Sequence, residues 1–195
     1  MMFEKHYEAF LEYSSRPGSS TTDLIDPDLR SVIYSIVNRH SGPEVLDKLI
    51  QLYHSAKMQD EQIRLLASLG YSSYQKVHEK CIEMAFNGEI RKQDRHCCLI
   101  SVGQSGPEGR RQVYDMIKAK NVDLIEDVGN SNLLGALLKA SLKDFASEEM
   151  LRDAQAFFKQ HKFPCTRAID QGLEFIQVNA NTLSRDGSSL IEYFE

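Results

Sequence analysis

The sequence predicts an all-α protein, built as a right-handed superhelix of antiparallel helix pairs with HEAT- or armadillo-like irregular repeats. Apolar residues recur at i, i+3, i+4 and i+7 along nearly the whole chain, whereas the alternation typical of strands is almost absent. Short loops containing Gly, Pro or Asn separate the periodic segments, which favours antiparallel neighbours. Each predicted helix has one apolar face, and stacked helical hairpins bury such faces. No strict sequence period is present, so the repeats are expected to be irregular.

The chain opens with an amphipathic, acidic helix over residues 1–14. The stretch SSRPGSSTTD, Ser14–Asp23, has the composition of a linker. We therefore expect residues 1–23 to form a leading helix with a Ser/Pro/Gly linker, and residues 24–195 to form the main helical domain.

Four helices are predicted between residues 26 and 85. Asp26 is a natural N-cap for the first, with Pro27 at its first helical position, and Gly42-Pro43 opens the second. Gly70 ends the third, and residues 72–75 have a capping-box pattern that opens the fourth. The inward-facing stripes expected on these helices are, in chain order, Leu29, Val32, Ile33, Ile36 and Val37; Leu46, Leu49, Ile50 and Tyr53; Ile63, Leu65, Leu66 and Leu69; and Tyr74, Val77, Cys81, Met84 and Ala85.

Further helices follow a break at residues 87–88. One is predicted over 90–102, and a turn over 103–109, with Ser105 and Glu108 as a second capping box, leads into the next. The last three helices centre on 133–142, 151–158 and 169–183, and the acidic tail LIEYFE is expected to end as a helical turn. Inward-facing positions expected in this half are Val113, Met116, Ile117, Ile169, Leu173, Ile176, Ala180 and Leu183.

Composition and charge limit the function classes. The chain has 195 residues, 42% of them apolar and 26% charged, with a net charge of −5. The acidic balance argues against nucleic acid as a partner. The four cysteines form no CxxC pair, which is typical of reduced thiols in a cytoplasmic protein. No apolar run approaches the ~20 residues that span a bilayer, so no membrane partner is expected.

A zinc site is considered and rejected at the segment VHEKCIEM. His78-Glu79 begins like the His-Glu-x-x-His motif of zinc peptidases, but Ile82 occupies the position of the second histidine. His78 and Cys81 could in principle combine with His96, Cys97 and Cys98. We interpret these residues as structural, because Cys81 lies on an apolar stripe and no helical spacing joins the two groups. No metal site, nucleophile–base arrangement or catalytic residue is predicted in this chain.

Two further segments carry candidate sites. The segment GQSGPEG has its glycines between two helices, whereas phosphate-binding glycine loops follow a strand, so we interpret it as an interhelical turn. The segment EIRKQDRH concentrates Arg91, Lys92 and Arg95, with Arg91 and Arg95 expected on one helical face. From the residues alone this is either a solvated charged face or an anion site.

The ordered set DPDLRSVIYSIVNRH, DEQIRLLASLG, GEIRKQD and AFFKQH…RAIDQGLEFIQVNANTLSRD resembles the C-terminal helical domain of puromycin-sensitive-type zinc aminopeptidases, the gluzincin aminopeptidase family. The resemblance runs from about Leu24 to the C-terminus. The family's zinc helix and its Gly-Ala-Met-Glu-Asn segment are absent here. Family members carry tryptophans where this chain has Tyr114, Val122 and Thr182, and of these only Tyr114 can keep an aromatic contact.

The resemblance implies a capping domain for a zinc-dependent aminopeptidase, which encloses the peptide-binding cavity and positions substrate without catalytic residues of its own. The implied partners are the parent's catalytic domain and a peptide substrate. Zinc is implied for that catalytic domain, with no cofactor in this chain, and the chain alone is expected to be inactive. Arg91, and second Lys92, become candidates for contacting the carboxylate of a bound peptide. The alternatives are a stand-alone helical-repeat adaptor and a regulatory protein that associates with an intact peptidase.

Overall fold

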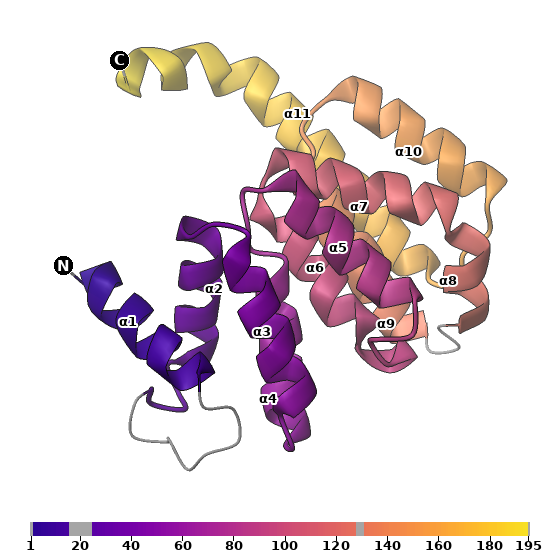
Figure 1. The fold of residues 1–195 in the computed structure, drawn as a ribbon. Coiled ribbons are helices and arrows are strands. Elements are labelled where there is room, and N and C mark those ends of the chain that lie inside the picture. Colours follow the sequence, from indigo (N-terminus) through magenta and orange to yellow (C-terminus); the bar gives the residue numbers. More distant parts are fainter. Residues whose placement is uncertain (1, 16–24, 128–130, 195) are drawn as a thin grey trace. The chain divides into compact units, whose positions relative to one another are not determined.

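All regular elements in the described part of the chain are helices, as predicted (Figure 1). The computed structural model describes residues 2–15, 25–127 and 131–194. Most of the expected linker, residues 16–23, lies outside this part. The elements are α1 (Met2–Ser14), α2 (Arg30–His40), α3 (Glu44–Ser55), α4 (Gln59–Leu69), α5 (Gln75–Phe86), the 3₁₀ turn η1 (Lys92–Asp94), α6 (Arg95–Ser105), α7 (Pro107–Ala119), α8 (Asn121–Asp127), α9 (Ser131–Leu142), α10 (Glu148–Gln160) and α11 (Thr166–Phe194).

The helices form two compact units, Met1–Val113 and Tyr114–Glu195, and α7 belongs partly to each. The all-α class is confirmed, whereas the right-handed superhelix and the domain boundary at residues 23–24 stay predictions. None of the helices in the described ranges is both long and apolar enough to cross a membrane.

In the first unit, α4 packs against α2, α3 and α6, while α5 packs on α6 and α1 on α2. Phe10 of α1 is fully buried and meets the ring of Tyr34 edge-on, with 6.1 Å between the ring centroids. The predicted stripes of α3, α4 and α5 supply much of the core of this unit. Its fully or nearly fully buried apolar residues include Val37, Leu49, Leu65, Leu66, Leu69, Val77, Cys81, Met84, Leu99 and Val102.

The end of α4 touches α6 so closely that residue 70 must be glycine. A Cβ at Gly70 would lie 2.2 Å from the backbone nitrogen of Val102, which is far inside van der Waals contact. The N–H of Gly70 donates to Ser101 Oγ at 2.9 Å. Asn38 of α2 donates from Nδ2 to the carbonyl oxygens of residues 68 and 69, at 3.0 and 2.6 Å. The last two carbonyl groups of α4 are thus satisfied by a side chain of α2.

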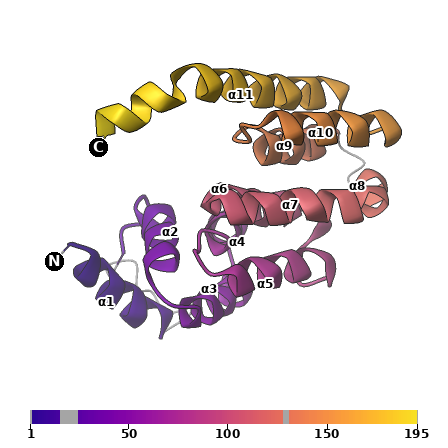
Figure 2. The same ribbon diagram turned by 90° about the horizontal axis from the view of Figure 1, so that it is seen from above.

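In the second unit, α9 and α10 both pack against α11 (Figure 2). Tyr114 is fully buried in this core and contacts Phe145 and Phe157, with ring centroids 5.7 and 6.5 Å away. The Tyr114 hydroxyl donates to Asp153 at 2.8 Å. Asn179 of α11 donates to two carbonyl oxygens just beyond α9, at 2.7 and 3.0 Å. The remaining buried members of this cluster are Leu142, Leu151, Ala154 and Ile176.

Several predicted helix starts are wrong. α2 begins at Arg30, a turn later than expected, and Asp26 instead accepts from the N–H of Asp28 at 2.9 Å. Ser72 accepts from the N–H of Tyr74 ahead of α5, rather than forming a capping box. The expected capping box at Ser105 is also wrong, because this residue is the last of α6. A local sequence pattern shows that a side chain able to cap a helix is present, but it does not show which backbone N–H that side chain will bind.

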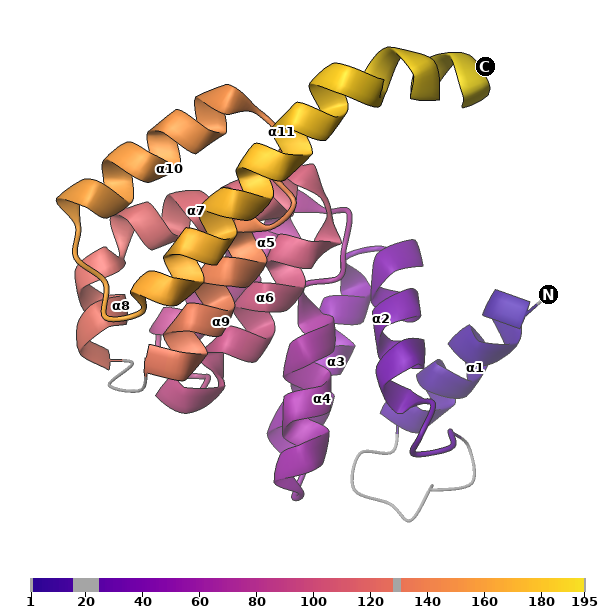
Figure 3. The same ribbon diagram turned by 180° about the vertical axis from the view of Figure 1, so that it is seen from behind.

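Three predicted stripes are only partly buried. On α2, Ile33 and Val37 face the core, but Val32 and Ile36 are 53% and 41% exposed, and Leu29, just before the helix, is 49% exposed. Tyr74, expected to face inward at the start of α5, is 45% exposed. On α11 the stripe is buried at Ile169, Ile176 and Ala180 and partly buried at Leu173, whereas Leu183 is 57% exposed. α11 has 29 residues and its partners α9 and α10 have 12 and 13, so it extends past them (Figure 3). The short helix α8 was not predicted at all.

Candidate functional site

Arg91 and Lys92 lie in the connection between α5 and α6. α5 ends at Phe86, and Gly88 has a φ of 96°, in the left-handed region that favours glycine. Ile90 is only 1% exposed, and its N–H donates back to a carbonyl of α5 at 3.3 Å. This anchor leaves Arg91 with φ −58° and ψ 139°, directly before the 3₁₀ turn η1.

The guanidinium of Arg91 contacts two side chains of the protein and is otherwise exposed to solvent. Its Nη2 donates to Gln62 Oε1 of α4 at 2.8 Å, and its Nε lies 3.0 Å from Asp94 Oδ2. The Asp94 side chain is 4% exposed, whereas that of Arg91 is 50% exposed. The two contacts fix the direction of the guanidinium, and its exposed part can meet an anion from solvent.

The structure does not bring the three cations of this segment together. α6 begins at Arg95 rather than near Ile90, so Arg91 and Arg95 do not share a helical face as predicted. Arg95 is 6% exposed, and its guanidinium lies 5.1 Å from the centre of the Phe86 ring. Lys92 is exposed beside Arg91. The candidate anion site is therefore reduced to Arg91 and Lys92.

His78 is a buried connector within the first unit. Its Nε2 carries a proton, because its 2.8 Å partner, the carbonyl oxygen of Ser72, can only accept. The same nitrogen lies 3.0 Å from the hydroxyl of Ser105, which itself donates to the carbonyl of Val102 at 2.7 Å. Nδ1 lies 3.0 Å from the side-chain amide of Gln112. His78 thereby links α5 to the preceding loop, to the end of α6 and to α7.

The cysteines near His78 behave as buried apolar residues, which matches their structural interpretation. Cys81 and Cys98 are fully buried, and the Cys98 thiol points at the Cys81 carbonyl oxygen at 3.9 Å. A hydrogen bond with the Cys81 thiol, reinforced by burial, raises the pKa of Cys98 well above its usual range. The Cys98 sulfur therefore stays protonated, whereas metal binding requires a thiolate. Within the described ranges, no three His, Cys, Asp or Glu side chains are placed to hold a metal ion.

His96 and Cys97, considered above only as metal ligands, contact each other. The Cys97 thiol lies 3.4 Å from Nε2 of His96, whose Nδ1–H donates to the carbonyl oxygen of Gln93 at 2.8 Å. Burial, and then the negative charge of Asp94, raise the pKa of Cys97 to about 11. A nucleophilic cysteine needs the opposite shift, so this pair is not arranged for catalysis.

The GQSGPEG segment joins two helices, but the turn is shorter than predicted. α6 continues to Ser105 and α7 begins at Pro107, so only Gly106 lies between them. A Cβ at Gly109 would lie 2.3 Å from the carbonyl oxygen of Val102. Here glycine allows α6 and α7 to approach closely, and the segment contains no phosphate-binding loop following a strand.

Comparisons with known proteins identify the family of this chain. The family model for the ERAP1-like C-terminal domain matches residues 3–178. Aminopeptidase M1-A of Oryza sativa subsp. japonica is 28% identical over 164 residues, which cover 82% of this chain and 18% of the relative. Aminopeptidase M1 of Arabidopsis thaliana is 24% identical over 181 residues, covering 91% and 20%, respectively. Aminopeptidase N of Homo sapiens is 24% identical over 191 residues, covering 95% and 19%.

The chain thus spans about a fifth of the length of the curated relatives that it matches. Conversely, the family match takes in most of this chain. The protein belongs to the ERAP1-like C-terminal domain family.

Proposed function

We propose that this chain is the C-terminal capping domain of a zinc-dependent aminopeptidase, in which it encloses the peptide-binding cavity and positions the substrate. The observation that carries the proposal is the family match over residues 3–178, together with relatives that are named aminopeptidases and are about five times longer. We do not favour a stand-alone adaptor, because the relatives give it no support.

The zinc ion of such an enzyme would be bound by its catalytic domain. The described residues of this chain do not suit zinc, since His78 is engaged through both ring nitrogens and Cys98 is held as a thiol. The role proposed for the chain is therefore confined to enclosure and positioning, which act through the orientation of the bound substrate.

Arg91 is the residue that we propose for contacting the carboxylate of a bound peptide, with Lys92 as a second cation. The pairing of Arg91 with the buried Asp94 and with Gln62 supports this role, because a guanidinium already fixed in direction loses less conformational entropy on binding. Its exposed part retains N–H donors suited to a carboxylate.

The proposal is tested first by the size and activity of the native protein. The native polypeptide should be several times heavier than the 22.2 kDa of this chain, and its sequence should contain His-Glu-x-x-His upstream. The purified 195-residue chain should not hydrolyse aminoacyl-coumarin substrates, with or without added zinc. A native polypeptide of 22.2 kDa that functions without a peptidase would overturn the proposal, as would zinc-dependent turnover by the pure chain.

Arg91→Ala in the full-length enzyme tests the carboxylate contact separately. We expect the KM for longer peptides with a free C-terminus to rise about tenfold, because a charge-assisted hydrogen bond is lost. The KM for the same peptides with an amidated C-terminus should hardly change. Lys92→Ala should have a smaller effect, and Arg152→Ala, an exposed arginine paired with Glu148, serves as a matched control. Equal effects on free and amidated peptides would contradict the role of Arg91.

A further inference from the structure

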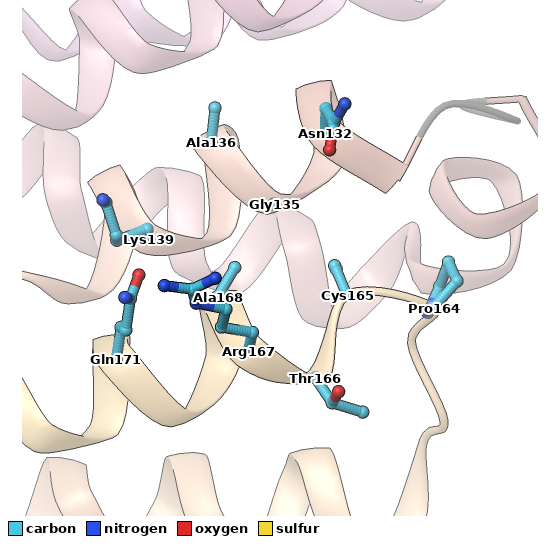
Figure 4. A pocket seen from close by; sticks show the side chains of 10 residues that line it. All are labelled: Asn132, Gly135, Ala136, Lys139, Pro164, Cys165, Thr166, Arg167, Ala168 and Gln171. Atoms are coloured by element: carbon cyan, nitrogen blue, oxygen red, sulfur yellow. The ribbon is translucent and has the colours of Figure 1, made fainter.

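A pocket of about 460 Å³ lies in the second unit, between α9 and the start of α11 (Figure 4). Its volume falls in the range typical of small-molecule sites. One wall is a single face of α9, formed by residues 132, 135, 136 and 139, and the other is formed by residues 164–168 and 171. Ala136, Ala168 and Gly135 keep the space between the walls open because their side chains are small or absent.

Two cations and an amide reach into this space from opposite walls. Lys139 extends from α9, while Arg167 and Gln171 extend from α11; Figure 4 shows the polar ends of Arg167 and Gln171 next to each other and the ammonium of Lys139 on the α9 side of the same pocket. Within the described ranges, no acidic side chain lines the pocket.

Neither cation has an ion-pair partner in the described part of the chain. Some other basic residues of the same unit are paired: Lys118 with Asp153 at 2.8 Å, Arg152 with Glu148 at 3.4 Å, and Arg185 with Asp186 at 2.7 Å. Two like charges at one pocket in an acidic protein repel each other, so an anion bound between them would relieve this repulsion.

We propose that this pocket binds a small dianion of the phosphate or phosphomonoester class. The guanidinium of Arg167 can donate two parallel hydrogen bonds to two phosphate oxygens, the ammonium of Lys139 supplies a point charge, and the amide of Gln171 supplies a further donor. A dianion balances the two positive charges, which a monocarboxylate cannot do. The inference does not depend on the peptidase role, because none of these residues belongs to the Arg91 site.

The test uses the whole 195-residue chain, titrated at constant ionic strength and followed by amide chemical shifts. The probes are inorganic phosphate, glycerol 2-phosphate and acetate. Phosphate should bind saturably with a Kd on the order of 1 mM, and acetate at least about tenfold more weakly. Tighter binding of glycerol 2-phosphate than of phosphate would identify a phosphomonoester site, and the reverse order a site for free phosphate. The absence of saturable binding by either phosphate compound, or acetate binding of equal strength, would overturn the proposal.

Matched variants locate the site. Arg167→Gln and Lys139→Gln should each weaken phosphate binding about fivefold or more, and the double variant should abolish it. Ala136→Leu should also abolish binding, because it fills the pocket without changing any charge. Lys162→Gln removes the same charge from an exposed residue that does not line the pocket, and should leave the Kd within about twofold. Far-UV circular dichroism checks that each variant folds. If Lys162→Gln weakened phosphate binding as much as Arg167→Gln or Lys139→Gln does, binding would depend only on the overall charge of the protein, and the proposed pocket would be wrong.

Discussion

At the scale of single residues, His78 shows how a buried polar side chain can serve packing rather than chemistry. It is 2% exposed, and both ring nitrogens have partners on other elements of the first unit. Buried polar groups are tolerated when they are hydrogen-bonded in this way. The histidine that first suggested a zinc helix is therefore a structural residue, linking α5 to α6 and α7.

His78→Ala should lower the free energy of unfolding by about 2–4 kcal/mol, because it leaves a cavity and removes the hydrogen bonds of several buried groups. Urea denaturation of wild type and variant measures the difference. Lys76→Ala, at an exposed position two residues earlier, is the control and should change stability by less than about 0.5 kcal/mol. An unchanged denaturation midpoint for His78→Ala would show that the network contributes no net stability.

Cys97 should react slowly with iodoacetamide although it is only half-buried. At pH 9 a cysteine with the ordinary pKa of 9.0 is half thiolate, whereas a pKa of about 11 leaves roughly 1% thiolate. Peptide mass spectrometry should show alkylation of native Cys97 at least about tenfold slower than in the urea-unfolded chain. The difference should shrink as the pH approaches 11. Equal rates in both states at pH 9 would mean that the thiol is not protected.

At the scale of helices, backbone carbonyl groups at helix ends accept hydrogen bonds from side chains that are far away in the sequence. Asn38 of α2 caps the end of α4, and Asn179 of α11 donates to the backbone beyond α9. In both cases the partners are 30 or more residues apart. Local sequence patterns cannot reveal such caps, because they depend on which helices pack together.

Gly70→Ala should destabilise the packing of α4 on α6. The added Cβ would meet backbone atoms of Ser101 and Val102, which cannot move aside as a flexible side chain could. We expect a loss of at least about 2 kcal/mol in the free energy of unfolding.

Gly106→Ala is the control for this substitution. A Cβ there meets nothing within 4 Å, so the change should lie within about 1 kcal/mol of wild type. Thermal or urea unfolding compares the two variants directly. Similar destabilisation by both would show that the close approach at Gly70 is not responsible.

At the scale of the whole molecule, the fold is expected to stand without any metal. Excess EDTA should shift the thermal unfolding midpoint by less than about 1 °C, because the described residues offer no cluster of metal ligands that could couple binding to folding. Differential scanning calorimetry measures the shift. A drop of several degrees that added zinc restores would reveal a metal site that contributes to stability.

The sequence by itself determined the all-α class, most helix positions and the family. Helical periodicity depends on the spacing of apolar residues, which the chain records directly. It also identified Arg91 and Lys92 as an exposed cationic pair, but wrongly joined Arg95 to them. The helix was expected to start near Ile90, whereas Arg95 begins α6 and packs over Phe86.

Only the tertiary structure decided which apolar faces are covered and which polar groups meet. Val32 and Leu183 have the periodicity of core residues, yet they are exposed because no described helix covers them. The pocket between Lys139 and Arg167 was also invisible, because its walls come from separate helices. A one-dimensional pattern specifies the apolar face of a helix, but the partner for that face is fixed by packing in three dimensions.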